Sequence, residues 1–271
     1  MVDYYGTDCS FLKNKKLWLL DMDGTIYLGN GIFEGTLDFL NQIEKNGGKY
    51  VLLTNNSSKG KDDYVKKVSQ MGIKADENSF YTSVDAAVML LKNRFGSELI
   101  YAQGTHSFIK NLREGGLNVT EKYDDNAKCV IVAFDTELTL EKLSATCRTL
   151  LKEVPYYATN PDWVCPTEFG YVPDCGSMCF GIEKATGKSP VYIGKPGPVM
   201  INEAIKKFGA KKEDAVMVGD RIYTDVASGV NAGVDTVLVL SGETTAEVCN
   251  KSEVKPSLVL SDVGEIARII K

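Results

Sequence analysis

Two carboxylates stand one residue apart at the end of an apolar run. Residues 17–20 read Leu-Trp-Leu-Leu, and Asp21 and Asp23 follow. A short apolar run is typical of a buried strand, and strand side chains alternate faces, so both carboxylates are expected on one side of its end. Burying two neighbouring anions is costly unless protons or a cation compensate. The spacing therefore favours a divalent metal site, with an ordinary Asp-Gly turn as the alternative.

A second apolar run also ends in acids. Residues 215–219 lead into Asp220, and Asp225 follows within the same segment. Because ligands of open α/β sheets bind beyond the carboxyl ends of the strands, Asp21 and Asp220 are expected at one site. Asp225 is interpreted as a residue that holds a metal-bound water, or as a carboxylate facing a helix dipole, rather than as a direct ligand.

Two further apolar segments end in groups that bind anions. Residues 50–53 lead into Thr54 and Asn55, and residues 191–193 lead into Lys195 after one glycine. Hydroxyls, loop amides and an ammonium group are what a dianionic phosphate needs. Both segments are therefore expected to end at the same site as the carboxylates.

The order of these four segments resembles the haloacid dehalogenase superfamily of aspartyl phosphatases. The matching motifs are DMDGT (21–25), LLTNNSS (52–58), GKP (194–196) and GDRIYTD (219–225). Between them, VAFD (132–135), ATNPD (158–162), PDCGSM (173–178) and IEKATG (182–187) resemble the NagD-type, nitrophenylphosphatase-like branch. The likeness extends from about Leu17 to the C-terminus.

The chemistry and the resemblance together suggest catalytic roles. Asp21 is expected to be the nucleophile, because a carboxylate is already ionised at neutral pH and needs no activating base. Asp23 would protonate the leaving oxygen and then deprotonate water. Mg2+ would be held by Asp21, by the backbone carbonyl of Asp23 and by Asp220, as oxygen ligands suit this ion. His106, the only histidine, is expected at a helix start or on the surface.

Other residues are expected to hold the substrate. Thr54 would donate its hydroxyl and Asn55 its backbone amide to the phosphoryl oxygens, and Lys195 would neutralise the phosphate and Asp21. Gly24 would let the backbone turn and approach the substrate closely. Asn160 lies on an Asn-Pro-Asp turn, where substrate contact and a purely structural turn are equally plausible.

Strand and helix signals alternate from Leu17 onward, which indicates an α/β fold with a parallel sheet. The resemblance specifies a doubly wound, Rossmann-like core. Residues 82–188 alternate in the same way, are long enough for a core of their own, and lie between the second and third motifs. We therefore expect a discontinuous core domain, 1–81 and 189–271, with an inserted α/β cap domain, 82–188.

The composition of the chain argues against a nucleic-acid or membrane partner and favours a reducing compartment. The 271 residues carry a formal charge of −5, and no run of Lys and Arg suggests a nucleic-acid partner. No apolar run is long enough for a membrane span, and residues 1–6 lack the charged start and apolar segment of a signal peptide, so neither feature is expected. Seven cysteines fit reduced thiols in the cytoplasm, with Cys165, Cys175 and Cys179 as packing residues rather than zinc ligands.

These features predict a Mg2+-dependent phosphatase of small phosphorylated metabolites. The resemblance implies sugar phosphates, nucleoside monophosphates and aryl phosphates as substrates, and a possible homodimer through the cap. A phosphotransferase using the same aspartyl phosphate and a non-enzymatic phospho-metabolite sensor remain alternatives. An oxidoreductase is disfavoured, since no G-x-G-x-x-G follows a strand.

Overall fold

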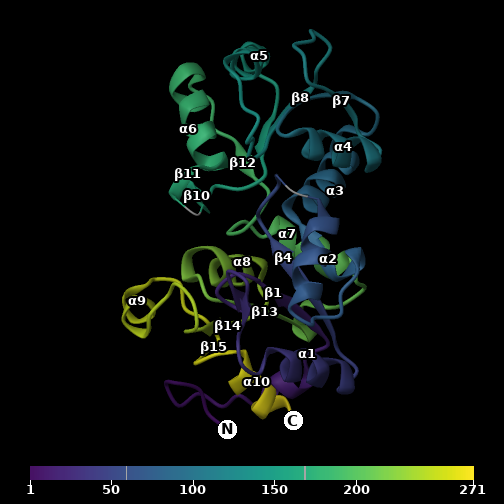
Figure 1. Cartoon of the computed structure of the whole chain (residues 1–271). Helices are drawn as coiled ribbons and strands as arrows, with labels where there is room; N and C mark the ends of the chain where they lie inside the picture. The colour runs from purple at the N-terminus through teal and green to yellow at the C-terminus, as the bar shows by residue number, and fades with distance from the viewer. Residues whose placement is uncertain (59, 168) are drawn as a thin grey trace. The chain divides into compact units, whose positions relative to one another are not determined.

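The computed structural model describes residues 1–58, 60–167 and 169–271, and the chain forms two compact units (Figure 1). Unit 1 comprises Met1–Thr54, Lys61–Tyr81 and Lys195–Lys271, and unit 2 comprises Asn55–Gly60 and Thr82–Gly194. The chain therefore passes between the units at four points, after Thr54, Gly60, Tyr81 and Gly194.

Unit 1 is built on a six-stranded sheet of order β15-β14-β13-β1-β4-β5. Neighbouring strands from β15 to β4 pair in parallel. The strands are β1 (Leu17–Leu20), β4 (Lys49–Thr54), β5 (Phe80–Thr82), β13 (Ala215–Gly219), β14 (Asp235–Val239) and β15 (Leu258–Leu260), with a small antiparallel pair, β2 (Tyr27–Leu28) and β3 (Gly31–Ile32). The helices are α1 (Thr36–Lys45), α2 (Lys61–Gln70), α7 (Val199–Lys207), α8 (Ala227–Ala232), α9 (Ala246–Lys251) and α10 (Val263–Ile270), with the short helices η1 (Ser10–Asn14), η2 (Glu77–Ser79), η3 (Lys212–Asp214) and η4 (Ile222–Val226).

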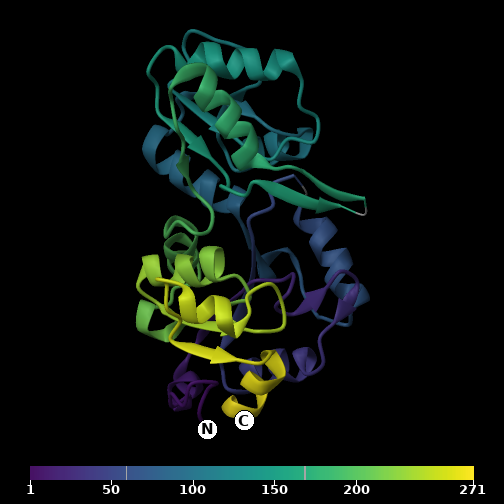
Figure 2. The same cartoon turned by 90° about the vertical axis from the view of Figure 1, so that its left-hand side faces the viewer.

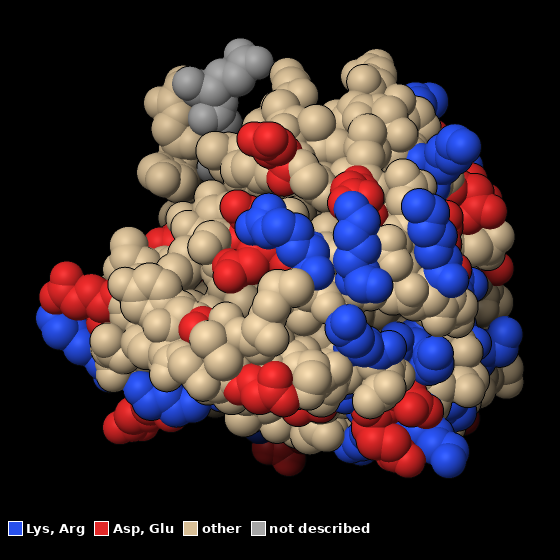
Figure 3. All heavy atoms as spheres, turned by 90° about the horizontal axis from the view of Figure 1, so that it is seen from below, with Lys and Arg blue, Asp and Glu red and all other residues tan. Residues whose placement is uncertain are grey.

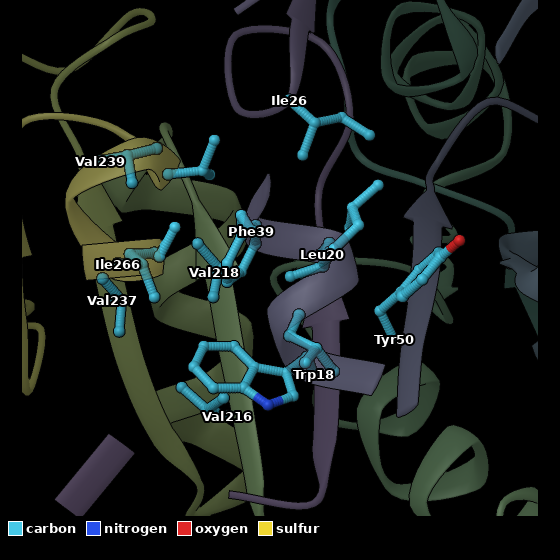
Figure 4. Close-up of a cluster of buried hydrophobic side chains, with 14 of the residues drawn as sticks. Trp18, Leu20, Ile26, Phe39, Tyr50, Val216, Val218, Val237, Val239 and Ile266 are labelled. Atoms are coloured by element: carbon cyan, nitrogen blue, oxygen red, sulfur yellow. The ribbon is translucent and has the colours of Figure 1, made fainter. Parts of the chain in front are cut away.

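The core of unit 1 explains why its central strands are apolar throughout. Every residue of β1 is buried, as expected for a strand inside a parallel sheet covered on both faces. On one face, Trp18 meets Phe39 of α1 edge to face, with ring centroids 5.4 Å apart, and Val216 and Val218 continue the layer (Figure 4). The predicted α/β class with a parallel sheet is confirmed.

Unit 2 has its own five-stranded sheet of order β12-β9-β8-β6-β7, and all four of its strand pairs are parallel. Its strands are β6 (Leu99–Gln103), β7 (Asn118–Thr120), β8 (Cys129–Val132), β9 (Tyr156–Ala158) and β12 (Val191–Tyr192). Its helices are α3 (Ser83–Phe95), α4 (His106–Glu114), α5 (Leu140–Leu150) and α6 (Cys175–Thr186). An antiparallel hairpin, β10 (Val164–Thr167) and β11 (Gly170–Pro173), extends away from this sheet (Figure 2).

One predicted strand belongs to the other sheet. The sequence places residues 191–193 in the core, but β12 pairs in parallel with β9 of unit 2, Val191 opposite Tyr157 and Tyr192 opposite Ala158. Unit 2 accordingly extends to Gly194. Such a short strand joins whichever sheet edge offers unpaired backbone groups, and apolar spacing does not show which edge that is.

The tertiary structure gathers surface charges that the sequence disperses. Lys49, Lys74 and Lys207 line one hollow of unit 1, about 1030 Å³ in volume, together with Phe208 and Asp76. On the face seen from below, Lys and Arg side chains gather over the right half, with Asp and Glu among them (Figure 3). Runs in the sequence therefore understate how basic parts of the surface are.

The cysteines and the helices bear on two further expectations. Cys175 and Cys179 are buried in the core of unit 2 with their Sγ atoms 3.9 Å apart, as packing residues would be. Within residues 1–58, 60–167 and 169–271, no helix is both long and apolar enough to cross a membrane.

Candidate active site

The carboxyl ends of β1 and β13 bring the predicted acids of unit 1 together. The two strands pair in parallel with Leu20 opposite Val218, and the Asp21 amide continues the ladder by donating to the Val218 carbonyl at 2.9 Å. The π-helical turn η4 then returns Asp225 toward Asp220. One carboxylate oxygen from each of Asp21, Asp220 and Asp225 lies within 4.8 Å of the other two.

Lys195 lies inside this group of acids. Its Nζ donates to Asp21 Oδ1 at 2.5 Å and to Asp225 Oδ1 at 2.6 Å, and only 3% of the residue is exposed. The predicted neighbourhood of Lys195 and Asp21 therefore exists in unit 1. Lys195 contacts two of the three carboxylates, Asp21 and Asp225, so the three acids together carry more negative charge than this one ammonium group offsets.

The pKa values of Asp21, Asp220 and Lys195 are shifted by burial and by the neighbouring charges. Burial, followed by the neighbouring Asp225, raises the pKa of Asp21 to about 7, although Lys195 opposes the shift. Burial and Asp225 likewise raise the pKa of Asp220 above its ordinary value. Burial alone would lower the pKa of Lys195, but Asp21 and Asp225 raise it on balance. Burial is the first cause of the two raised carboxyl pKa values, and repulsion between the acids is the second.

Asp220 is fixed by a loop that sequence reasoning missed. The Glu243 amide donates to Asp220 Oδ2 at 2.7 Å, and the Thr25 hydroxyl donates to Oδ1 at 3.3 Å. A Cβ at Gly24 or at Gly242 would stand 2.4 Å or 2.0 Å from Asp220 Oδ2. Gly24 also has a φ of +86°, so its glycine is required both by the turn and by the approach of Asp220. The only signal for residues 241–244 was a polar segment after a predicted strand.

Asp23 and Thr54 also belong to unit 1. Asp23 is exposed and forms an isolated bridge with Tyr27. Burial first, and then the Asp23 and Asp21 charges, raise the pKa of the Tyr27 hydroxyl, which places both acids near that ring. Thr54 is buried at the end of β4, the strand that pairs with β1 on its other side.

Asn55 and Asn160 belong to unit 2, where a third residue joins them. Asn55 Nδ2 and Asn160 Nδ2 both donate to Asp162 Oδ2, at 3.1 and 2.8 Å. Asn160 is 1% exposed, and its Nδ2 also lies 3.2 Å from Asp174 Oδ1. The structure thus joins these two predicted residues to each other within unit 2, while the remaining predicted site residues lie in unit 1.

Two charged residues have contacts that fit lesser roles. Arg221 forms an ion pair with Glu243 at 2.9 Å, and both side chains are partly exposed. His106 begins α4 and its side chain is 87% exposed, so its interpretation as a helix-start surface residue is confirmed.

The comparisons with known proteins agree with this arrangement. Residues 18–118 match the family model described as haloacid dehalogenase-like hydrolase, and residues 192–266 match a second model, described as HAD-hydrolase-like. The chain is 33% identical to an acid sugar phosphatase of Staphylococcus haemolyticus, covering 93% of this chain and 95% of that protein.

Solved structures share the fold over nearly the whole chain. A 4-nitrophenylphosphatase of Thermotoga maritima is 40% identical with a TM-score of 0.90, covering 96% of this chain and 99% of that one. A structure assigned to NagD is 38% identical with a TM-score of 0.86, covering 94% and 98%. A glycerol phosphate phosphatase of Mycobacterium tuberculosis, solved with calcium, is 25% identical with a TM-score of 0.88, covering 94% and 76%. With its four motifs in order and its acids gathered at the strand ends, the chain belongs to the haloacid dehalogenase superfamily, as a NagD-type phosphatase.

Proposed function

We propose that the protein hydrolyses small phosphorylated metabolites in the cytoplasm, with Mg2+ as cofactor and an aspartyl phosphate at Asp21 as intermediate. Sugar phosphates, nucleoside monophosphates and aryl phosphates are the proposed substrates. The observation that carries the proposal is the group of three neighbouring acids, two of which contact the buried Lys195. Cys9, Cys129 and Cys249 are buried free thiols, which supports a reducing compartment.

The residues present fit a divalent cation. The candidate ligands are carboxylate oxygens, which Mg2+ prefers, and they lie close enough to share one ion. Burial first, and then repulsion from Asp225, raises the pKa of Asp21 and of Asp220, and a bound cation would oppose both effects. Asp21, the Asp23 carbonyl and Asp220 would hold the ion, and Asp225 would hold one of its waters. When bound, the ion would neutralise phosphate charge.

The chain's own residues carry the two steps. An Asp21 carboxylate oxygen attacks phosphorus, the bond to the ester oxygen breaks, and Asp23 gives that oxygen its proton. A water then attacks the same phosphorus while Asp23 takes a proton from it, and the bond to Asp21 breaks to release inorganic phosphate. Asp23 is suited to this exchange because it is exposed, so water can reach it.

Other residues would bind the phosphoryl group. Lys195 is suited to this role, because it is buried and its Nζ donates a hydrogen bond to Asp21 Oδ1. We propose that Thr54 donates its hydroxyl and Asn55 its amide to the phosphoryl oxygens. We propose that Gly24, which has no side chain, lets the backbone approach the phosphoryl group closely. Asn160 remains a proposed substrate contact, although its side-chain amide already donates hydrogen bonds to Asp162 and Asp174.

A panel of phosphate esters tests the proposal. Purified protein is assayed for release of inorganic phosphate from 4-nitrophenyl phosphate, glucose 6-phosphate and adenosine monophosphate, with Mg2+ and then with excess EDTA. We expect turnover with Mg2+ and loss of turnover with EDTA, restored by added Mg2+. Full activity after exhaustive chelation would contradict the cofactor assignment.

The same assay separates the alternatives. A phosphotransferase would form a new phosphate ester when glycerol or ethanol is added, which phosphorus NMR detects. A sensor would bind phosphate esters without releasing phosphate. Product that is only inorganic phosphate supports the hydrolase.

We also propose a homodimer through unit 2, whose α5 and α6 bound an apolar groove of about 870 Å³. Leu138, Leu143 and Met178 line it, and Leu140 at its edge is 79% exposed, as a contact surface would be. Light scattering after size exclusion should give a dimer mass for the wild type and a monomer mass for Leu140→Arg. A monomeric wild type would contradict the dimer.

A further inference from the structure

The loop that follows β4 belongs structurally to unit 2. Asn55–Gly60 is assigned to unit 2, although Thr54 before it and Lys61 after it belong to unit 1. Hydrogen bonds connect this loop to other residues of unit 2. The Ser83 hydroxyl donates to the Asn55 carbonyl at 2.7 Å, and the Phe134 amide donates to Ser57 Oγ at 3.1 Å. A loop with a proposed phosphate contact is therefore held by the inserted domain.

The turn at residues 159–162 holds this loop at two points. Ser57 Oγ lies 3.0 Å from Thr159 Oγ1, and both groups are buried. Asn55 Nδ2 donates to Asp162 Oδ2 at 3.1 Å. Because the two anchors lie on alternate residues of the loop, they fix its backbone as well as its side chains.

The Asn55 side chain is closely confined. On its other side lies Gly194, where a Cβ would stand 2.5 Å from Asn55 Oδ1. Gly194 is in turn held by its amide, which donates to the Thr159 carbonyl at 2.8 Å. The carboxylate of Asp162 thus holds a side chain that has little room to move.

The Asp162 carboxylate accepts a further hydrogen bond within unit 2. Asn160 donates to the same oxygen at 2.8 Å and also lies within 3.2 Å of Asp174, the residue that caps α6. The resulting chain of hydrogen bonds runs from Asn55 through Asp162 and Asn160 to the N-terminus of α6. In such an arrangement Asp162 can orient a residue that contacts the substrate without contacting the substrate itself.

We propose that Asp162 is a positioning residue for the reaction: it fixes the Asn55 side chain so that the Asn55 backbone amide is presented to the phosphoryl group. This inference rests on the proposed phosphatase function and on the proposed role of Asn55.

Kinetics on two substrates distinguish a positioning role of Asp162 from leaving-group recognition and from a purely structural role in the turn. The phosphoryl group is the same in every ester, so Asp162→Ala should lower kcat/KM by about 10- to 100-fold, and by the same factor for 4-nitrophenyl phosphate and glucose 6-phosphate. Asp162→Asn keeps one acceptor oxygen and should recover most of the loss. A loss confined to one substrate would assign Asp162 to leaving-group recognition and overturn the inference. A lower Tm with unchanged kinetics would make it a turn residue only.

A matched control and a second readout complete the test. Asp124 accepts the Asn126 amide at 2.7 Å in another turn of unit 2, so Asp124→Ala removes a comparable turn carboxylate and should leave kcat/KM unchanged. Asn55→Ala combined with Asp162→Ala should lose little more than Asp162→Ala alone, because both act through one contact. Full additivity would contradict the inference.

Hydrogen exchange tests the same link without catalysis. Amides of residues 55–58 should exchange faster in Asp162→Ala than in Asp124→Ala, with β4 unchanged. Equal exchange in the two variants would overturn the inference even in an active enzyme. If the two variants differ in exchange as expected but the wild type hydrolyses none of the esters, the proposed function is refuted, and with it the role of Asp162 in that reaction.

Discussion

Two groups of acids, one in each unit, have partners of different kinds. In unit 1, Asp21, Asp220 and Asp225 lie close together, and Lys195 contacts Asp21 and Asp225. In unit 2, Asp162 and Asp174 accept hydrogen bonds from neutral amides, including the Cys175 amide at the start of α6. The first group lacks positive charge, whereas the second is satisfied by uncharged donors.

This difference shows which unit is prepared for a charged ligand. An excess of buried carboxylates is unstable until a cation arrives, so the unit 1 cluster favours metal binding. A carboxylate surrounded by amide donors gains little from a cation and serves instead to hold backbone in place. The variants below test that contrast, from the largest expected effect to the smallest.

Asp21→Asn should have the largest effect. It keeps the shape of the side chain but removes the nucleophilic charge, so kcat should fall by at least about 1000-fold. The metal-free variant should be at least as stable as the metal-free wild type, because one repelling charge is gone. Steady-state kinetics and thermal unfolding measure both, with mass spectrometry to exclude deamidation. Near-normal turnover in the intact Asp21→Asn variant would refute the nucleophile.

Lys195→Met should follow, because it leaves Asp21 and Asp225 without their ammonium partner. We expect kcat/KM to fall by about 100- to 1000-fold. Lys195→Arg should rescue poorly, since a planar fork does not replace a point charge between Asp21 and Asp225. Arg221→Ala is the comparison variant and should cost less, because the ion pair of Arg221 with Glu243 is partly exposed and worth at most about 1 kcal/mol, although the pKa of Arg221, which burial would lower, is also raised by Asp21. If Arg221→Ala is the more damaging and Lys195→Arg is silent, the phosphate clamp is misassigned.

Metal should stabilise the wild type and not a variant that lacks a ligand. At Mg2+ concentrations of about 100 times Kd, binding should add about 2.7 kcal/mol to the free energy of unfolding. Asp220→Asn should lose most of this gain, while Asp162→Asn should keep it, because Asp162 belongs to the other unit. Urea unfolding with Mg2+ and with EDTA measures the difference. An equal gain in both variants would place the metal elsewhere.

Asp174 should produce the smallest effect, and one that depends on pH. Burial raises its pKa to about 6, so the folded protein holds this proton more tightly than the unfolded chain. As pH rises from about 4 to 6, the unfolded chain ionises first, and Asp174 should lower stability by roughly 1–3 kcal/mol. Asp174→Asn still caps α6 but cannot ionise, so its stability should fall less between pH 4.5 and pH 7 in urea unfolding. Identical pH dependence would show that Asp174 ionises normally.

Much of the fold and of the candidate site could be predicted from local patterns. Apolar runs with alternating helices predicted β1, β4 and β13 within a residue or two, because burial inside a parallel sheet requires continuous apolar residues. Acids directly after β1 and β13 predicted that Asp21 and Asp220 meet, since parallel strands end at the same edge. The Lys195 contact with Asp21 fits the expected charge balance.

Only the tertiary structure decided which unit each short segment joins. β12 and the loop Asn55–Gly60 lie next to core motifs in the sequence, yet both belong to unit 2. The Glu243 contact to Asp220 was likewise invisible, because the donor is a backbone amide that carries no residue signature. Residue types and spacing determine strands, helices and the acids at their ends, since those depend on nearest neighbours along the chain. The partners of a two-residue strand, a loop or a backbone amide depend on groups distant in sequence, and folding alone brings these together.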